Sequence, residues 1–221
     1  MILGFSHLAW TAAASWEEDA ARLRDAGYSL AFRASGVPNP IEKRPLLSVY
    51  HSDHDLALYR HEGSGLAVER IDHRSVGSLT APECGPYRFD WHEPELLRLH
   101  CRRIEEERSF WMRALGFRSG SDADELVMHR PVASWSARMR LVSDAAVKPS
   151  RLDDPGHGCV AFVVSSLERD LAAVIAAGAR EATPVFTLSP NGQSLRIALF
   201  RTPGGAICEF LQPPATARSV S

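Results

Sequence analysis

The strongest constraint on this chain is a block that occurs three times, each copy joining an apolar strand to an amphipathic helix that ends at a glycine. The copies run from His7 to Gly27, from Leu96 to Gly116 and from Cys159 to Gly178, which are nearly equal intervals. Short strand-like runs follow each copy. Because a repeated block has to fold as the same supersecondary unit each time, repetition constrains the architecture before any single motif does.

The first block shows the signals of its helix and strands most clearly. Ser15 and Glu18 have the spacing of a capping box. Trp16 and Leu23 then belong to one helical stripe, and Gly27 provides the left-handed stop. The runs YSLAFR, LLSVYHS, DLALYRH and LAVERID follow, separated by turn-forming residues, and predict strands.

The other two blocks repeat this order with differences. In the third block, Ser165 and Glu168 again have capping-box spacing, and TPVFTL, LRIALFR and AICEFLQ predict strands. The middle block has the helix ERSFWMRAL and only two strand-like runs, ELVMHR and SARMRLVSD. The segment from His73 to Glu95 is irregular and reads as a connector. We therefore predict an α+β fold of βαβββ units over residues 1–75, 95–145 and 156–213, with the middle unit degenerate.

The composition excludes several classes of protein. With 45% apolar and 24% charged residues the chain is typical of soluble globular proteins. The net charge of −2 gives no reason to expect nucleic acid or a membrane surface as partner, and no apolar run is long enough to span a membrane. Four cysteines without CxxC spacing favour a reduced, cytoplasmic setting. Only two of the 25 basic residues are lysines, Lys43 and Lys148.

A βαβββ unit repeated within one chain resembles the vicinal oxygen chelate superfamily, which includes glyoxalase I, extradiol dioxygenases and bleomycin-resistance proteins. The resemblance is most specific in CVAFVVSSLERDLAAVIAAGA and RTPGGAICEFLQPP of the third block, and GFSHLAW and GLAVER carry it in the first. It implies curved, half-open barrel sheets with helices outside, in which two units surround one divalent metal.

The resemblance also implies where the metal ligands lie, on the first and last strands of each unit. Block one offers His7 and Glu69 at these positions, and block three offers Glu209 but has Cys159 where a histidine is usual. Block two offers Leu96 and Arg140, which do not suit a divalent ion. His7, Glu69 and Glu209 are thus the candidate ligands of Fe, Zn, Mn or Ni.

The residues themselves support part of this set. Glu69 alternates with Ala67 and Ile71, so its carboxylate is expected to point inward, where it needs a partner or a metal. Glu209 alternates in the same way between Ile207 and Leu211. Glu69 and Glu209 are therefore also the candidate catalytic groups. Each has a simpler interpretation as a hydrogen-bonded residue, and we favour a small buried residue for Cys159, with His157 as an alternative ligand.

The middle block has a different signature. By alternation, Arg98 and His100 share one strand face, and Arg138 and Arg140 share another. Such a cluster could bind a substrate carboxylate or phosphate, since arginine binds these groups bidentately. We favour the simpler interpretation that this face is exposed or paired with acidic residues. The run YHSDHD, from Tyr50 to Asp55, also resembles a metal site, but we interpret it as a turn.

The sequence leaves the pairing of three units open. Blocks two and three could fold together while block one pairs with its copy in a homodimer, or block one could pair with block three. The predicted function is that of a metal-dependent enzyme, an isomerase, lyase or dioxygenase, acting on a small oxygenated substrate. The alternative is a metal-free protein that binds or sequesters a small molecule. We expect a homodimer, because an odd number of units leaves a sheet edge uncovered.

Overall fold

The computed structural model describes residues 1–11, 15–63, 66–74, 85–129 and 136–214. Its helices are α1 (Trp16–Asp25), α2 (Ile104–Leu115) and α3 (Leu167–Ala176), with a 3-10 helix η1 (Ile41–Leu46). No helix in these ranges is long and apolar enough to cross a membrane. The strands are β1 (Ile2–Thr11), β2 (Tyr28–Pro38), β3 (Asp53–His61), β4 (Val68–Asp72), β5 (Tyr87–Phe89), β6 (Leu96–Cys101), β7 (Arg118–Ser119), β8 (Glu125–His129), β9 (Ser136–Ser143), β10 (Gly156–Val164), β11 (Phe186–Leu188), β12 (Leu195–Arg201) and β13 (Ile207–Gln212).

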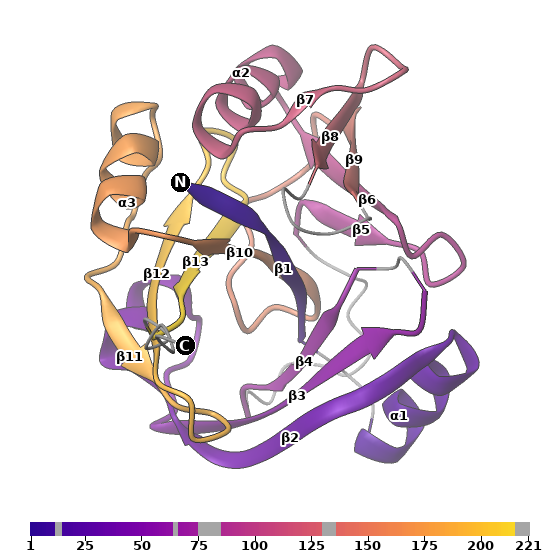
Figure 1. Ribbon diagram of the computed structural model, residues 1–221, viewed down its shortest axis with the longest axis vertical. Coiled ribbons are helices and arrows are strands. Elements are labelled where there is room, and N and C mark those ends of the chain that lie inside the picture. The colour runs from indigo at the N-terminus through magenta and orange to yellow at the C-terminus, as the bar shows by residue number, and fades with distance from the viewer. Residues whose placement is uncertain (12–14, 64–65, 75–84, 130–135, 215–221) are drawn as a thin grey trace, which may run out of the picture.

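The first and third blocks form one eight-stranded sheet in the order β11-β12-β13-β10-β1-β4-β3-β2. The two first strands, β1 and β10, pair antiparallel, with His7 opposite Ala161. Each is flanked on its other side by the last strand of its own unit, in parallel. The sheet curls around its concave face (Figure 1). Of the two pairings that the sequence left open, the structure has the one between blocks one and three of the same chain.

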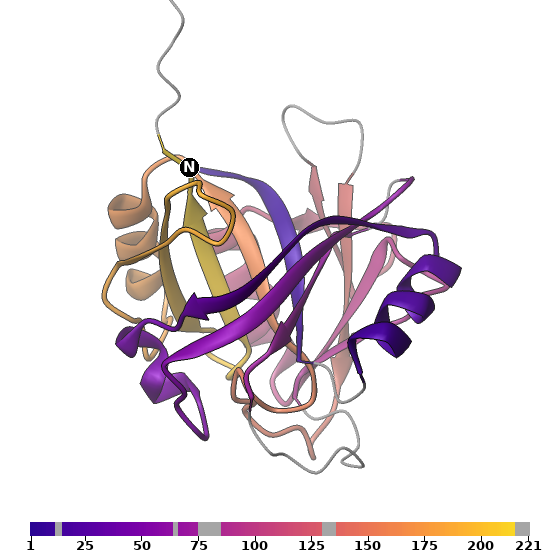
Figure 2. The same ribbon diagram turned by 90° about the horizontal axis from the view of Figure 1, so that it is seen from below.

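The middle block forms a second, five-stranded sheet in the order β5-β6-β9-β8-β7. It stands behind β1 and β10, as the rotated view shows (Figure 2). Its first strand, β6, pairs with β5, whose residue Tyr87 lies opposite Leu99. The interpretation of residues 73–95 as an irregular connector was therefore wrong for Tyr87–Phe89, which cover the edge of β6. The α+β fold with curled half-barrel sheet is confirmed.

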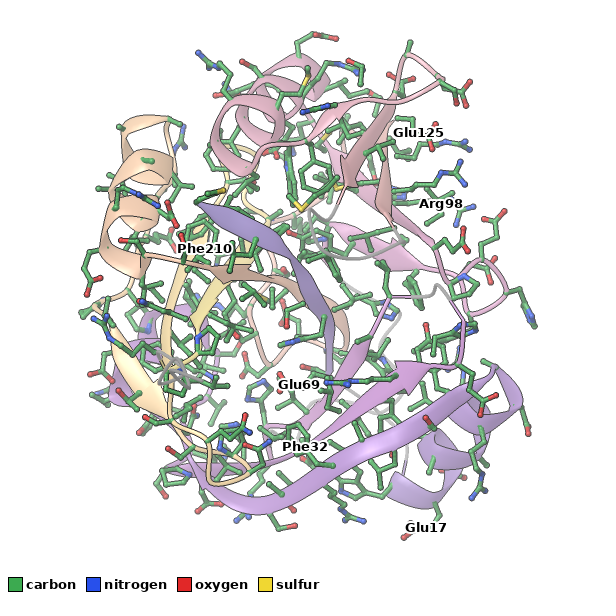
Figure 3. All side chains as sticks on the ribbon, in the orientation of Figure 1. Glu17, Phe32, Glu69, Arg98, Glu125 and Phe210 are labelled. Atoms are coloured by element: carbon green, nitrogen blue, oxygen red, sulfur yellow. The ribbon has the colours of Figure 1, made fainter. Side chains whose placement is uncertain are left out.

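Helix α1 lies on the outside of the curl, where a buried ion pair holds it (Figures 1 and 3). The guanidinium of Arg70 on β4 donates to Asp19 on α1 at 2.6 Å and lies 3.6 Å from the centre of the Trp16 ring. The predicted capping box is present, with the Glu18 amide donating to Ser15 Oγ. Alternation on β4 therefore sends Arg70 outward to the helix and its neighbour Glu69 to the concave side.

The predicted capping box of the third block was wrong. Helix α3 has Ser166 as its N-cap and no side-chain bond from that residue. The amide of Leu167 donates instead to the side chain of Gln212, from the end of β13. A group from the adjacent strand thus satisfies a free helix donor, which local sequence spacing could not reveal.

The segment LLSVYHS, from Leu46 to Ser52, is not the predicted strand. The amides of Ser48 and Val49 donate to the carboxylate of Asp153 at 2.7 and 2.9 Å. The amide of Leu152 donates to the carbonyl of Leu46 at 2.8 Å. Because these backbone groups bond to the linker between blocks two and three, they are not available for a sheet ladder.

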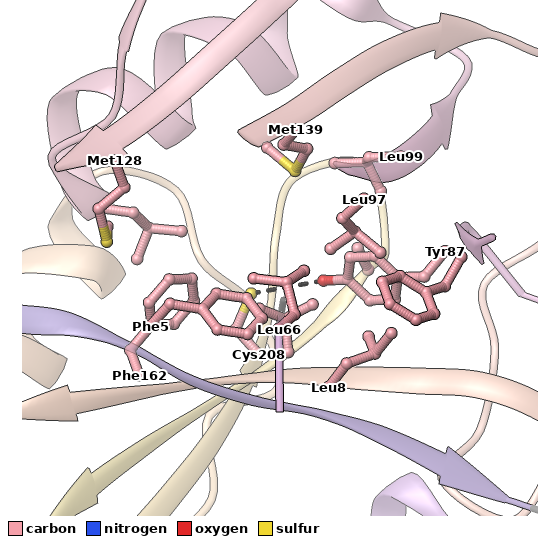
Figure 4. Close-up of a cluster of buried hydrophobic side chains, with 14 of the residues drawn as sticks. Phe5, Leu8, Leu66, Tyr87, Leu97, Leu99, Met128, Met139, Phe162 and Cys208 are labelled. Atoms are coloured by element: carbon pink, nitrogen blue, oxygen red, sulfur yellow. Dashed lines mark hydrogen bonds between the residues drawn. The ribbon is translucent and has the colours of Figure 1, made fainter. Parts of the chain in front are cut away.

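The main hydrophobic core lies between the two sheets, against the back of the first strands of blocks one and three. Figure 4 shows Phe5 and Phe162 of the large sheet near Leu97 and Met139 of the small one. The Tyr87 hydroxyl donates to the Ile207 carbonyl at 2.9 Å across this boundary. The middle block thus covers the convex face of the eight-stranded sheet, and its concave face remains for a site.

Candidate functional site

The concave face of the eight-stranded sheet holds a cavity of about 120 Å³ with one polar end and one apolar wall. This volume is below the ~300–1,000 Å³ of pockets for drug-sized ligands, so the cavity suits a small molecule. Glu69 lies within the curve of the sheet, with Phe32 on the β2 side (Figure 3). The polar end comprises Ser6, His7, Lys43, His54, Glu69 and Glu209, and the apolar wall comprises Phe32, Leu56, Leu58, Ile71, Leu188, Pro190, Leu195, Ile197 and Leu211.

His7 and Glu69 form a pair at this polar end. Nε2 of His7 lies 3.4 Å from Oε2 of Glu69, and Nδ1 lies 3.1 Å from the Ser6 hydroxyl. Burial by itself would lower the pKa of His7, but the Glu69 carboxylate outweighs burial and raises it. Burial would likewise raise the pKa of Glu69, but His7 and Lys43 lower it. The pair therefore tends toward imidazolium and carboxylate.

Glu209 faces the same cavity from β13, and its carboxylate makes no hydrogen bond or ion pair within the described part of the chain. Burial raises the pKa of Glu209, although Lys43 and His7 act in the opposite direction. Ile71 and Leu211 line the cavity beside Glu69 and Glu209, as strand alternation predicted. The structure thus brings the three predicted residues, His7, Glu69 and Glu209, to one cavity.

The sequence analysis did not anticipate Lys43, whose side chain is only 5% exposed and reaches the cavity from η1. A 3-10 helix has three residues per turn, so Lys43 and Leu46 face the same side, and both are buried. The Lys43 ammonium lies 5.6 Å from the centre of the Phe186 ring. A weak signal existed, because Lys43 is one of two lysines in a chain that otherwise uses arginine.

His54 was also missed, since the run YHSDHD was interpreted as a turn. Strand β3 begins at Asp53, and alternation places His54 on the same face as Leu56 and Leu58, toward the cavity. Burial and the charge of Lys43 lower the pKa of His54 to about 3. The ring of His73 lies 5.8 Å away, and the same causes lower its pKa to about 4. Both imidazoles are therefore neutral, and neither Nδ1 atom has a hydrogen-bond partner.

The arrangement does not fit the divalent metal that the family resemblance implies. Across the described ranges, no three His, Cys, Asp or Glu side chains converge closely enough to hold an ion. Lys43 places a positive charge in the same cavity as His7, Glu69 and Glu209. A divalent cation there would be repelled at short range in a medium of low dielectric constant.

The predicted substrate-binding residues Arg98, His100 and Arg140 lie on the small sheet, apart from this cavity. Arg98 lies at the outer edge of the molecule (Figure 3) and forms an ion pair with Glu93. His100 pairs with Asp144 at 3.1 Å, and Arg140, whose side chain is 41% exposed, lies 3.5 Å from Asp122. Arg138 pairs with Glu125. The structure thus gives each of them an acidic neighbour, and a role in ligand binding stays a prediction.

Cys159 and His157 are buried away from the ligand-lining set. Burial raises the pKa of the Cys159 thiol well above its usual value, which suits a small packed residue. His157 packs among Trp10, Phe89 and Trp91, and burial lowers its pKa to about 3. Cys101 and Cys208 are also free and buried, and Cys84 lies outside the described residues.

No protein-family model and no curated protein sequence matches this chain. Among solved structures, it is similar to glyoxalase I from Zea mays, at 16% identity and a TM-score of 0.39, over 95% of this chain and 67% of that one. A putative dioxygenase from Bacillus subtilis aligns at 12% identity and a TM-score of 0.42, over 96% and 64% of the two chains. A fosfomycin resistance protein from Mesorhizobium loti aligns at 14% identity and a TM-score of 0.38, over 56% and 93%. The strand order, with the first strands of blocks one and three paired, is the curled arrangement of two units that the family resemblance implied.

Proposed function

We propose that this protein is an enzyme that moves a proton on a small oxygenated substrate, as an isomerase or lyase does. The observation that carries the proposal is Glu209, an inward carboxyl without a partner among the described residues, facing a small cavity that also holds a buried ammonium. A carboxyl with a raised pKa is a suitable general base near neutral pH.

The neighbouring groups suit the chemistry of a carbonyl compound. Lys43 and the imidazolium of His7 can donate hydrogen bonds to a substrate oxygen and stabilise negative charge that develops on it. Glu209 removes the proton from the adjacent carbon and returns it to another position. Glu69 raises the pKa of His7 and so favours its charged form. The apolar wall excludes water from the reacting atoms.

The cavity volume argues against a drug-sequestering protein. About 120 Å³ does not accommodate a drug-sized molecule, so sequestration has less support than turnover of a small substrate. A metal-dependent reaction is the other alternative, in which His7, Glu69 and Glu209 would hold Fe, Zn, Mn or Ni. Metal analysis of protein purified without a chelator distinguishes it.

Hydrogen–deuterium exchange tests proton transfer without knowledge of the natural substrate. A panel of small ketones, hydroxyketones and keto acids is incubated with the protein in deuterated water and followed by NMR. We expect exchange next to the carbonyl of at least one compound, with a loss of 100-fold or more, on the order expected for a general base, in Glu209→Gln. Glu168→Gln, which alters a largely exposed carboxylate on α3, is the matched control.

We further propose a homodimer in a reducing, cytoplasmic setting. The support is that strands β2 and β11 end the large sheet, with Leu30 of β2 54% exposed, and that the three cysteines in the described ranges are free. Exposed edge strands are normally covered. Sedimentation analysis at micromolar concentration should find a dimer, and a compact monomer would contradict this part of the proposal.

A further inference from the structure

We propose that the ammonium of Lys43 takes the place of the divalent metal in this cavity, so that the protein binds the carbonyl or carboxylate oxygen of its ligand without a metal ion. This inference rests on the proposed use of the cavity as a substrate site. It assigns Lys43 as a residue that binds ligand directly, and it names the ligand class, small molecules with one oxygen-bearing end and an apolar body.

The position of the ammonium is the first observation. Lys43 is 5% exposed, lines the cavity, and makes no hydrogen bond or ion pair within the described part of the chain. Apart from the Phe186 ring, the ammonium has no neighbour in the described ranges that neutralises it, and Nζ is not among the enclosed polar atoms, so its three donors can reach an acceptor from a ligand or from solvent. The cavity is the space from which that acceptor can come.

The second observation is how the titratable groups surround this charge. His7, Glu69 and Glu209 line the cavity with Lys43, and His54 lines it from β3. The charge of Lys43 lowers the pKa of each of these four groups, so it lies within electrostatic reach of all of them. One cation therefore lies in the same cavity as both carboxylates and both imidazoles.

The third observation is that the backbone around Lys43 is anchored. The Lys43 amide donates to the Pro40 carbonyl at 3.0 Å. Leu46, the last residue of η1, accepts from the Leu152 amide, and Ser48 and Val49 donate to Asp153. Pro45 lies within η1 and restricts its backbone further. The Cα of Lys43 is thus held in place. Because the methylene chain of the side chain is buried, the ammonium at its end lies at the cavity.

A second polar group points to the same ligand. His54 is 1% exposed, lines the cavity, and has an Nδ1 atom without a partner. A neutral imidazole can donate or accept one hydrogen bond at each nitrogen. Because Nδ1 of His54 is itself enclosed, Lys43 and Nε2 of His54 are the groups that can donate to a ligand oxygen, while Leu56, Leu58 and Ile197 line the apolar part of the cavity.

Metal binding tests the inference without any need for turnover. Co²⁺ and Zn²⁺ are titrated by calorimetry into the wild-type chain, Lys43→Met, Lys43→Arg and Lys148→Met. We expect the wild type, Lys43→Arg and Lys148→Met to bind weakly. Lys43→Met should bind one ion per chain at least tenfold more tightly, because without the repelling charge His7, Glu69 and Glu209 can close around an ion, which they do not do in the present arrangement. In Lys43→Met, the visible spectrum of Co²⁺ should report oxygen and nitrogen ligands, and adding Glu209→Gln should remove the gain.

Two results would overturn the inference. One is tight binding of one Co²⁺ per wild-type chain that His7→Ala abolishes. The other is a folded Lys43→Met chain, with a wild-type near-ultraviolet dichroism spectrum, that binds the ions no better than the wild type. If Lys43→Met does not fold, the same titration is made with Lys43→Gln, because the glutamine amide is polar but carries no charge. A gain in metal binding without any deuterium exchange would refute the proposed function and leave this inference standing.

Discussion

The two sheets of this protein derive from the same repeated block, but the polar face of the large sheet encloses a cavity and that of the small sheet carries ion pairs at the surface. In the large sheet, the first strands of blocks one and three pair with each other, and the last strands bring Glu69 and Glu209 to a cavity. In the small sheet, β6 pairs with the short β5, and Arg98 on β6 and Arg140 on β9 lie in ion pairs that are partly exposed to solvent. Its apolar face packs on the back of the large sheet.

The difference lies in enclosure: the cavity of the large sheet lies between two paired units, whereas no second unit pairs with β6 in the described part of the chain. The middle block has a complete first and last strand, in parallel register with Arg98 opposite Arg140. With no partner unit across β6, that face stays open to solvent, and long charged side chains can occupy it at little cost.

The largest expected effect comes from the core that joins the two sheets. Phe162 is fully buried and its ring contacts those of Phe5, Trp111 and Phe117. Phe162→Ala should lower the free energy of unfolding by about 3–5 kcal/mol, measured by denaturant titration. A single transition is expected in the wild type, because the sheets share this core. Two separate transitions would show that the small sheet is an independent domain.

The next largest effect is expected at Glu107, which joins the middle block to the third block. Its carboxylate accepts hydrogen bonds from Trp111 Nε1 at 2.7 Å, Thr202 Oγ1 at 2.8 Å and the Gly204 amide, which links α2 to the turn before β13. Glu107→Ala removes the acceptor of these donors and should lower the free energy of unfolding by about 1–3 kcal/mol in total, because water can replace part of the lost bonds. Glu105→Ala, at an exposed neighbour on the same helix, should change the unfolding free energy by less than about 0.5 kcal/mol.

The buried histidines predict a pH dependence of stability. The pKa values of His54, His73 and His157 are about 3, 4 and 3, against an ordinary value of 6.5. Below pH 6.5 the unfolded chain takes up protons that the folded chain excludes. Stability present above pH 6.5 should therefore fall on acidification toward pH 4, by up to about 1.4 kcal/mol per pH unit for each histidine.

His157→Phe should reduce this slope by up to about 1.4 kcal/mol per pH unit, because it removes one of the three groups that take up a proton on unfolding. Phenylalanine suits the position, since His157 packs against aromatic rings. His92→Gln is the control, since His92 is exposed. Chemical denaturation at several pH values measures the slope. An unchanged slope in His157→Phe would contradict the assignment of a neutral, buried imidazole.

The smallest effect is expected on the open face of the small sheet. Arg140→Met breaks an exposed ion pair with Asp122 and should change stability by less than about 1 kcal/mol. The prediction that Arg98, His100 and Arg140 bind an anion is tested separately, by ligand binding. A phosphate or carboxylate ligand should then bind at least tenfold more weakly to Arg140→Met, and equal binding would make this face a scaffold only.

The repeated units could be predicted from the sequence, because they depend on local periodicity. His7, Glu69 and Glu209 were implied by the family resemblance, and strand alternation supported only the inward direction of the two glutamates. Lys43 could not be predicted, since its inward direction depends on a 3-10 helix anchored by residues more than a hundred positions later. His54 could have been, because HDLAL alternates. The Gln212 cap of α3 and the β5–β6 pair depend on tertiary neighbours that local patterns do not contain.

The anchoring of η1 has a consequence for how this chain tolerates changes in length. Connectors between repeated units usually accept insertions, because lengthening a loop costs little entropy. Here the linker before β10 holds the Lys43 segment through Leu152 and Asp153, and the Thr11 hydroxyl donates to the Leu152 carbonyl at 2.7 Å. Adding or removing one residue there would shift the bonds out of register and move the ammonium. The spacing between the second and third blocks is therefore constrained by the cavity rather than by the fold.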